Sequence, residues 1–93
     1  MKKDHPEAFP CLGVSKAGHD RGRLYIVIGV QNGMLQVADG VHSRVDKPKS
    51  KNEKHMQLIY NVPPEISDLL KEAKTDSDLI YIKKQYSRIQ SDR

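Results

Sequence analysis

The fold of this 93-residue chain is decided by the stretch LYIVIGVQNGMLQVADG, which runs from residue 24 to residue 40. Its first part, 24–30, is rich in β-branched and aromatic side chains, and its short length favours a strand over a helix. Asn32-Gly33 follows, and this pair between two apolar runs is a strong hairpin signal, because both central positions of a type I′ turn favour positive φ. The return segment 34–38 ends at a second turn signal, Asp39-Gly40. The stretch therefore predicts a β-hairpin.

Three further short segments are predicted as strands around this hairpin, at 11–15, 41–45 and 56–60. Each of the five is bounded by Gly, Asn or Asp, which favours a small barrel over a sandwich. Closure into a barrel also removes the edges that such short strands would otherwise expose. The chain contains no Trp and one Phe, so we expect Val, Ile and Leu to supply most of the core.

The pattern changes to a helical period after residue 61. Pro63-Pro64-Glu65 predicts a helix start, since Pro is tolerated in the first turn and Glu there suits the helix dipole. Thr75 or Asp76 is predicted to cap a second helix. The apolar face of the second helix comprises Leu79, Ile82, Tyr86 and Ile89, widened by Ile80 and Tyr81. We therefore expect a flexible lead-in over 1–10, a mostly β barrel of about five strands over 11–60 and a helical C-terminal extension over 61–93.

Length, charge and cysteine content narrow the class of protein. A chain of 93 residues can bury one modest core, which excludes a two-lobed enzyme. Its longest run of aliphatic residues, at 26–28, is far shorter than the roughly 20 apolar residues that a membrane-spanning helix needs. No apolar segment follows the charged residues at 1–6, so we expect no secretory signal, and the single Cys11 then favours the cytoplasm. Sixteen Lys and Arg against twelve Asp and Glu give a net charge of +4, which points weakly to an anionic partner.

The loop 15–23, between the first two predicted strands, is the first candidate site. It offers Lys16, Arg21 and Arg23 with only Asp20 opposing them, and it places His19 at the tip. Guanidinium groups and the backbone N–H groups of a glycine-rich turn suit phosphate oxygens. A tight hairpin loop with solvated charges explains the same residues equally well, and the stretch lacks the Gly-Lys-Ser/Thr ending of a P-loop.

The segment 44–55 is the second candidate, with five Lys and Arg against two acids. Lys47, Lys49 and Lys51 alternate, which in an extended chain puts all three on one side. A row of ammonium groups beside the loop 15–23 would form a continuous positive face for nucleic acid. The alternative is a solvated linker. The candidate contacts in this segment are Arg44, Lys47, Lys49, Lys51, Lys54 and His55, of which Arg44 and His55 could also stack on unpaired bases.

Three motifs in order, GVSKAGHDRGR at 13–23, ADG at 38–40 and PKSKNEKH at 48–55, resemble those of KOW-motif proteins. The likeness covers about residues 11–60 and is strongest to the small bacterial KOW-domain RNA-binding proteins. These are related to a KOW-domain ribosomal protein of the archaeal and eukaryotic large subunit. Gly22 corresponds to the central glycine of the motif. The tail over 63–93 matches no functional motif.

The resemblance implies an SH3-like barrel that binds structured RNA, usually ribosomal RNA, as a ribosomal protein or ribosome-associated factor. It implies that the loop around Gly22 and the neighbouring basic segment contact the RNA, and the charges themselves point to recognition of the phosphate backbone rather than of base edges. Ribosomal proteins are possible further partners. We expect a monomer when the protein is free, with no membrane association.

Other functions find less support in the sequence. The histidines His5, His19, His42 and His55 lack the spacing of paired zinc ligands, so no metal and no cofactor are expected. No catalytic Ser/His/Asp set or carboxylate pair stands out, so we do not expect an enzyme. The alternative is an SH3-like protein-interaction module, a scaffold in the transcription or translation machinery, that binds its partner through the barrel or through the apolar stripe of the last helix.

Overall fold

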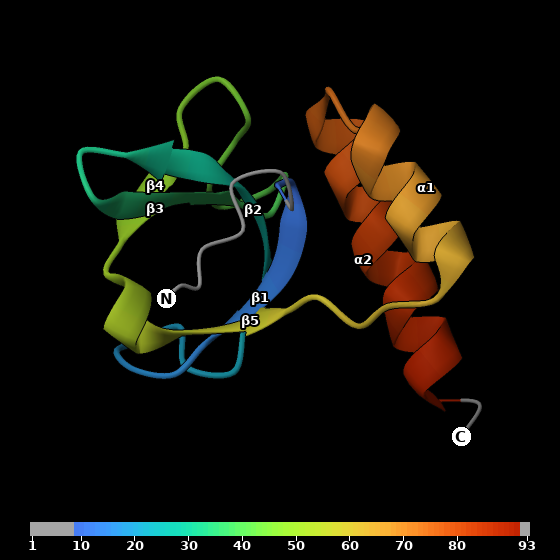
Figure 1. The fold of residues 1–93 in the computed structure, drawn as a ribbon, viewed down its shortest axis with the longest axis horizontal. Coiled ribbons are helices and arrows are strands. Elements are labelled where there is room, and N and C mark those ends of the chain that lie inside the picture. Colours follow the sequence, from blue (N-terminus) through green and yellow to red (C-terminus); the bar gives the residue numbers. More distant parts are fainter. Residues whose placement is uncertain (1–8, 92–93) are drawn as a thin grey trace.

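The computed structural model describes residues 9–91 and confirms a mostly β fold with a helical tail (Figure 1). Its antiparallel sheet has the strand order β4-β3-β2-β1-β5. The strands are β1 (Cys11–Ser15), β2 (Leu24–Gln31), β3 (Met34–Ala38), β4 (Lys49–Lys51) and β5 (Met56–Ile59). A short 3-10 helix, η2 (Glu53–His55), joins the two edge strands, and the tail consists of α1 (Pro64–Glu72) and α2 (Asp76–Ser91). Of the predicted lead-in over 1–10, only Phe9 and Pro10 lie within the described residues.

The predicted central hairpin, with its turn at Asn32-Gly33, is confirmed. Strand β2 pairs with β3 from Ile26 opposite Ala38 to Gln31 opposite Met34. The turn residues Asn32 and Gly33 have φ values of 55° and 78°, as a type I′ turn requires. A register shift between Val27 and Gly29 interrupts the ladder, and such bulges bend a strand and increase its twist. The bend helps this small sheet to curl into a barrel.

The predicted strand at 41–45 is wrong, and the fourth strand lies further along, inside the basic segment. The carboxylate of Asp39 accepts the backbone N–H groups of Val41, His42 and Ser43 at 2.8–3.0 Å, so these groups are not available to a sheet. The chain forms a loop there, with one isolated bridge between Arg44 and Lys47. The strand that pairs with β3 is instead β4, which consists of Lys, Ser and Lys.

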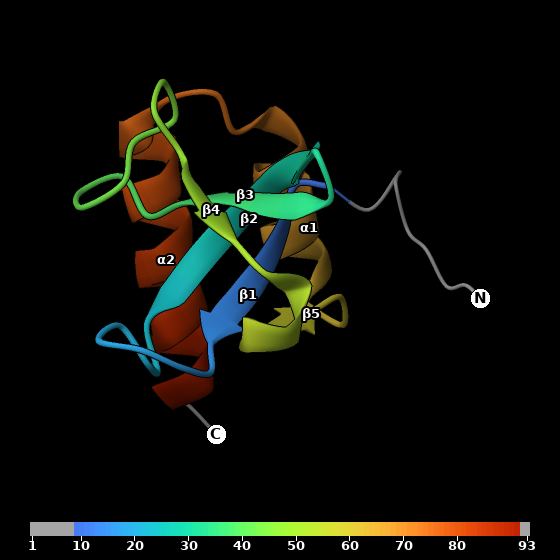
Figure 2. The same ribbon diagram turned by 90° about the vertical axis from the view of Figure 1, so that its left-hand side faces the viewer.

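Both faces of the sheet are buried, and each faces a different hydrophobic cluster. Alternate strand side chains point into the barrel, as the period of two requires. The barrel cluster comprises Cys11, Tyr25, Val27, Leu35, Val37 and Met56. The opposite face carries Leu12, Ile26 and Ala38, which pack against the helices. The two-layer arrangement of curled sheet and helix pair is visible from both sides (Figures 1 and 2).

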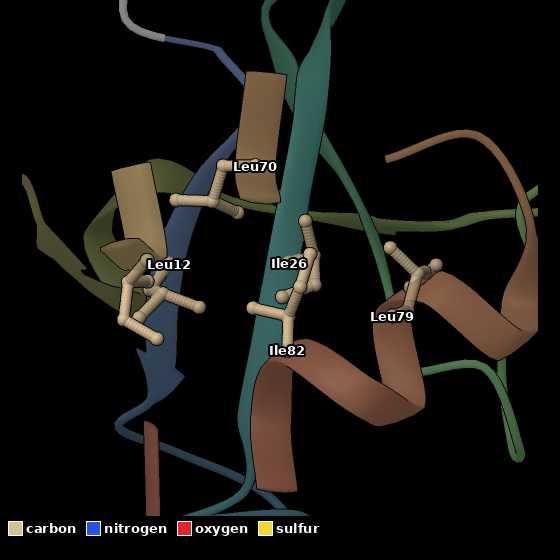
Figure 3. Packing of buried hydrophobic residues seen from close by; sticks show 7 residues of the cluster. Leu12, Ile26, Leu70, Leu79 and Ile82 are labelled. Atoms are coloured by element: carbon tan, nitrogen blue, oxygen red, sulfur yellow. The ribbon is translucent and has the colours of Figure 1, made fainter. Parts of the chain in front are cut away.

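The helical tail packs on the barrel through the apolar face that its sequence predicts. Ile66 and Leu70 of α1, with Leu79 and Ile82 of α2, are almost fully buried against the sheet (Figure 3). Burial of one such side chain contributes about 1.5–3 kcal/mol, so the tail supplies part of the stability of the whole fold. Ile80 and Tyr81, expected to widen the stripe, are 40% and 52% exposed. Neither described helix has the length and apolar composition that a bilayer crossing needs.

The start of α2 is fixed by a capping box and by the loop 39–47. The Thr75 hydroxyl accepts the Asp78 N–H at 3.2 Å, and the Asp78 carboxylate accepts the Thr75 N–H at 3.0 Å. Asp76, the alternative cap in the sequence, instead accepts the backbone N–H of Val45 at 2.8 Å and the Arg44 side chain at 3.0 Å. These contacts attach the first turn of α2 to the loop.

Candidate nucleic-acid interface

The loop between β1 and β2 is a compact turn held by its own backbone. The Gly22 N–H donates to the Ser15 carbonyl at 2.8 Å, and the Arg23 N–H donates to the Asp20 carbonyl at 2.8 Å. Gly22 has a φ of +89°, and no atom lies within 4 Å of the position a Cβ would take. The backbone conformation therefore requires glycine there, whereas packing within the chain does not. The space beside it is open to another molecule.

Six of the ten predicted contact residues gather at this end of the molecule. The Lys16 N–H donates to the His55 carbonyl at 2.8 Å, which joins the loop to η2. Arg23 is half-buried and the other five are exposed. In residues 9–91 none of the six makes a side-chain ion pair shorter than 4.0 Å. We call this set the basic end: Lys16, His19, Arg21, Arg23, Lys54 and His55.

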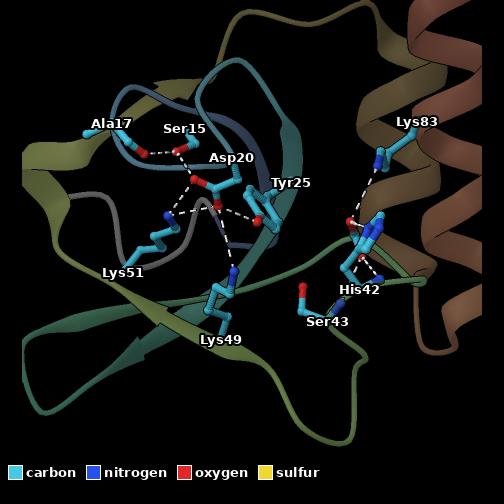
Figure 4. Close-up of polar contacts among 10 residues, drawn as sticks. Ser15, Ala17, Asp20, Tyr25, His42, Ser43, Lys49, Lys51 and Lys83 are labelled. Atoms are coloured by element: carbon cyan, nitrogen blue, oxygen red, sulfur yellow. Dashed lines mark hydrogen bonds and ion pairs between the residues drawn. The ribbon is translucent and has the colours of Figure 1, made fainter.

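A buried carboxylate, that of Asp20, holds the β1–β2 loop of the basic end in place. Asp20 is 8% exposed, and its oxygens accept the Ser15 hydroxyl at 2.8 Å and the Tyr25 hydroxyl at 2.5 Å (Figure 4). The Lys51 ammonium lies 2.8 Å from Oδ2 of the same carboxylate, and that of Lys49 lies 3.8 Å away. One acidic side chain thus ties the β1–β2 loop to β2 and to β4. From the sequence, Asp20 was expected only to oppose the basic charges of the loop. The signal for its structural role was its position between Gly18 and Gly22.

Ionisation in this network follows from burial and hydrogen bonding. Burial alone would raise the pKa of Asp20, but the hydrogen bonds from Lys51, Tyr25 and Ser15 outweigh it and hold that pKa well below its usual range. Burial, and next the hydrogen bond to Asp20, raises the pKa of Tyr25 to about 12. Asp20 is therefore charged and Tyr25 neutral at neutral pH. Since Tyr25 is fully buried, it has no ring face to offer a base.

Of the three lysines predicted to form one outward-facing row, Lys47, Lys49 and Lys51, not all face the solvent. Lys49 and Lys51 lie on one side of β4, as their alternation predicts, but that side faces Asp20. The Lys51 side chain is 16% exposed, so its charge serves mainly inside the network, whereas that of Lys49 is 47% exposed. Lys47 lies outside β4, in the loop 39–47, and is exposed.

Arg44 and Lys47 do not join the basic end. Their loop lies at the opposite end of the molecule from the β1–β2 loop (Figure 1). The Arg44 Nε lies 3.0 Å from Oδ2 of Asp76, so this guanidinium has a partner on α2. The ten predicted residues therefore divide into the basic end, two lysines over Asp20 and two residues near the start of α2.

A second buried carboxylate, that of Asp39, holds the loop 39–47; its partners His42, Ser43 and Lys83 are labelled in Figure 4. Besides the three N–H groups of the loop, Asp39 faces His42 Nδ1 at 3.1 Å and Lys83 Nζ at 4.0 Å. Burial alone would raise the pKa of Asp39, but the backbone N–H groups of Ser43 and Val41, with His42, lower it well below its usual range. This aspartate forms the turn that the Ala-Asp-Gly sequence predicts, and it is 1% exposed.

The two aspartates predict a loss of stability in acid. A group whose pKa is lower in the folded protein stabilises the fold above its unfolded pKa, about 3.9 for Asp, and loses this effect as the pH falls towards the folded value. We expect the free energy of unfolding, measured by urea denaturation, to decrease as the pH drops from about 5 to about 2. Asp39→Asn should make that decrease shallower. A flat profile in the wild type would contradict the assigned hydrogen bonds.

Metal binding and thiol chemistry find no support in the described residues. No group of three or more His, Cys, Asp or Glu side chains within 9–91 could hold a metal ion. Cys11 is buried in β1, and this burial raises the pKa of its thiol to about 12. A thiol with such a pKa is a poor nucleophile at neutral pH.

Comparisons with known proteins assign no family. No protein-family model matches the chain, and no curated protein matches it significantly. The KOW resemblance therefore stays a prediction that rests on the motifs within residues 11–60.

Proposed function

We propose that this chain is an RNA-binding module that contacts the phosphate backbone of structured RNA, with ribosomal RNA as the favoured ligand. The observation that carries the proposal is the basic end, where six basic residues meet without a side-chain ion pair among the described residues. Unpaired surface cations on rigid loops release counterions when they meet phosphates, which is the main source of affinity for nucleic acid.

The internal arrangement of the basic end supports this proposal. Asp20, the one acid within the β1–β2 loop, is turned inward and neutralised by Lys51, so it does not oppose an approaching phosphate. The loop is also held by Asp20 and by the bond from Lys16 to η2, so little ordering is needed on binding. The open space beside Gly22 allows the backbone of a ligand to come close.

The alternative function, a protein-interaction module, would use either the apolar stripe of the last helix or the barrel. In the stripe of the last helix, Leu79 and Ile82 are 2% and 1% exposed against the barrel and Tyr86 and Ile89 are half-buried, which leaves less of the stripe for a partner. The remaining route would use the barrel, where Phe9, Ile59 and Val62 help to line a hollow beside α1, and no feature of the described residues indicates a peptide for it. We therefore favour the RNA-binding role. We propose it for a non-enzymatic monomer in the cytoplasm that uses no cofactor.

Salt dependence tests the proposal directly. If about 4–6 phosphates are contacted, affinity for a fluorescein-labelled RNA hairpin should fall roughly 150- to 2,000-fold between 50 and 200 mM salt, as read from fluorescence anisotropy. Lys16→Gln/Arg21→Gln should weaken binding roughly tenfold or more and reduce the salt slope. Lys71→Gln/Lys74→Gln, which removes equal charge from exposed residues at the end of α1 and just beyond it, is the control. Salt-independent binding would overturn the proposal.

The ribosomal part of the proposal needs a separate experiment. Ultraviolet crosslinking in cells, followed by sequencing of the attached RNA, should collect reads on one helix of large-subunit ribosomal RNA. Reads scattered over many transcripts would keep RNA binding but overturn the ribosomal assignment.

A further inference from the structure

The C-terminal half of α2 carries a basic hollow that the sequence did not single out. The hollow is open and has a volume of about 550 Å³. Its lining consists of Lys83, Lys84, Ser87, Arg88 and Ser91. Lys83, Ser87 and Ser91 form one row at intervals of four along α2, and Lys84 and Arg88 form the neighbouring row. The two rows make up one face of the helix, away from the buried stripe. Among the described residues, the lining combines three cations with two hydroxyl donors and includes no acid.

The acids of α2 cannot neutralise this face. Asp76 and Asp78 both lie in the first turn of the helix, at the other end. Asp76 is engaged by Arg44 and Val45, and Asp78 caps the helix. Lys83 approaches Asp39 at 4.0 Å, but among the described residues Lys84 and Arg88 make no ion pair shorter than that. Lys84 and Arg88 are exposed, and no acidic side chain of residues 9–91 supplies them with a counter-charge.

The hollow lies at the same end of the molecule as the β1–β2 loop. Figures 1 and 2 both place the last turns of α2 and that loop at this end. Burial lowers the pKa of Lys83, the charge of Asp39 opposes this, and the charge of Arg23, which belongs to the basic end, lowers the pKa a little further. The two sets of cations therefore share one electrostatic field.

We propose that this face of α2 is a second phosphate-binding surface, which extends the basic end and makes the helical tail part of the RNA contact. The Arg88 guanidinium can donate to two phosphate oxygens at once, and the Lys84 ammonium supplies a point charge. The Ser87 hydroxyl, in the same lining, adds a hydrogen-bond donor. The inference rests on the proposed function, since it names further residues for the same class of ligand.

The rigid packing of the helical tail also favours its participation in the RNA contact. Ile82 lies one residue before Lys83 and is 1% exposed in the cluster shared with β1 and β2. The basic face is thereby held in a fixed orientation relative to the β1–β2 loop. A continuous RNA backbone can then bridge both surfaces without reorganisation of the protein.

The test removes the two exposed cations of the hollow. Lys84→Gln/Arg88→Gln should weaken binding of the fluorescein-labelled RNA hairpin roughly tenfold or more near 0.1 M salt, and should lower the slope of log K against log salt by about 1.5–2. Lys71→Gln/Lys74→Gln, with the same loss of charge, should change affinity less than about threefold. Circular dichroism should show an unchanged fold in both variants, because none of the four side chains belongs to the buried core.

The outcomes separate this inference from the proposed function. If Lys84→Gln/Arg88→Gln behaves as its control while Lys16→Gln/Arg21→Gln loses affinity, the second surface is refuted and the RNA-binding role stands. If the wild type itself binds the hairpin without salt dependence, both proposals fail together.

Discussion

Asp20→Asn is expected to lower the free energy of unfolding by about 3 kcal/mol, because removal of one partner from a buried ion pair leaves the other charge uncompensated. The carboxylate is 8% exposed, and the Lys51 side chain beside it is 16% exposed. Asparagine keeps the shape but not the charge, so two ammonium groups would face a neutral amide. Since small domains have about 5–15 kcal/mol of stability, the loss should move the urea midpoint by roughly 1–3 M.

A matched control separates the effect of losing a buried charge from the effect of losing any charge. Asp68→Asn removes the same charge from an exposed position on α1 and should change stability by less than about 0.5 kcal/mol. Adding Lys51→Met to Asp20→Asn should recover part of the loss, because the unpaired ammonium is then gone. Equal urea midpoints for Asp20→Asn and Asp68→Asn would show that the network contributes little.

The fold was predictable wherever apolar periodicity and turn chemistry agreed. The hairpin of β2 and β3 has a run of β-branched residues, an Asn-Gly turn and a return strand, and all three signals indicate one structure. The helices were predictable for the same reason, since their apolar faces and caps coincide. The fourth strand was missed because β4 contains no apolar residue, and its pairing comes from its neighbour β3.

The error at 41–45 has a different origin. Val41 and Val45 suggest a strand, but one side chain, that of Asp39, captures three consecutive N–H groups of the backbone. Side-chain to backbone hydrogen bonds of this kind compete with a sheet ladder. An Asp-Gly pair marks a turn in the sequence, but whether the turn is a tight hairpin or a wider loop depends on what the loop packs against, here α2.

The candidate site was predictable in composition but not in placement. The charges of loops 15–23 and 44–55 can be counted from the sequence. Which of these charges face outward depends on two aspartates. Asp20 forms a largely buried ion pair with Lys51, and Asp76 pairs with Arg44 at the start of α2. The hollow on α2 was missed because two of its basic residues, Lys84 and Arg88, are separated by uncharged residues in the sequence. In the helix, these two residues lie one turn apart and therefore on the same face.

Gly40→Ala is expected to destabilise the fold by about 3 kcal/mol or more, because it combines backbone strain with a collision. Gly40 has a φ of +85°, where a side chain costs about 1–2 kcal/mol. A Cβ there would lie 2.7 Å from the Asp76 carbonyl oxygen and 2.9 Å from Cγ1 of Ile80. The carbonyl belongs to the first turn of α2 and cannot rotate away as a side chain can, so the loop 39–47 and the helix must separate.

Gly33→Ala distinguishes the collision from the strain, because the two glycines share a conformation and differ in surroundings. Gly33 has a φ of +78°, and no atom lies within 4 Å of the place where the alanine Cβ would stand. It should therefore lose only about 1–2 kcal/mol in the same urea titration, with amide exchange in α2 unchanged relative to the rest of the chain. Gly40→Ala should in addition speed exchange in the first turns of α2. Equal losses in the two variants would mean that close contact between the loop and α2 does not hold the tail in place.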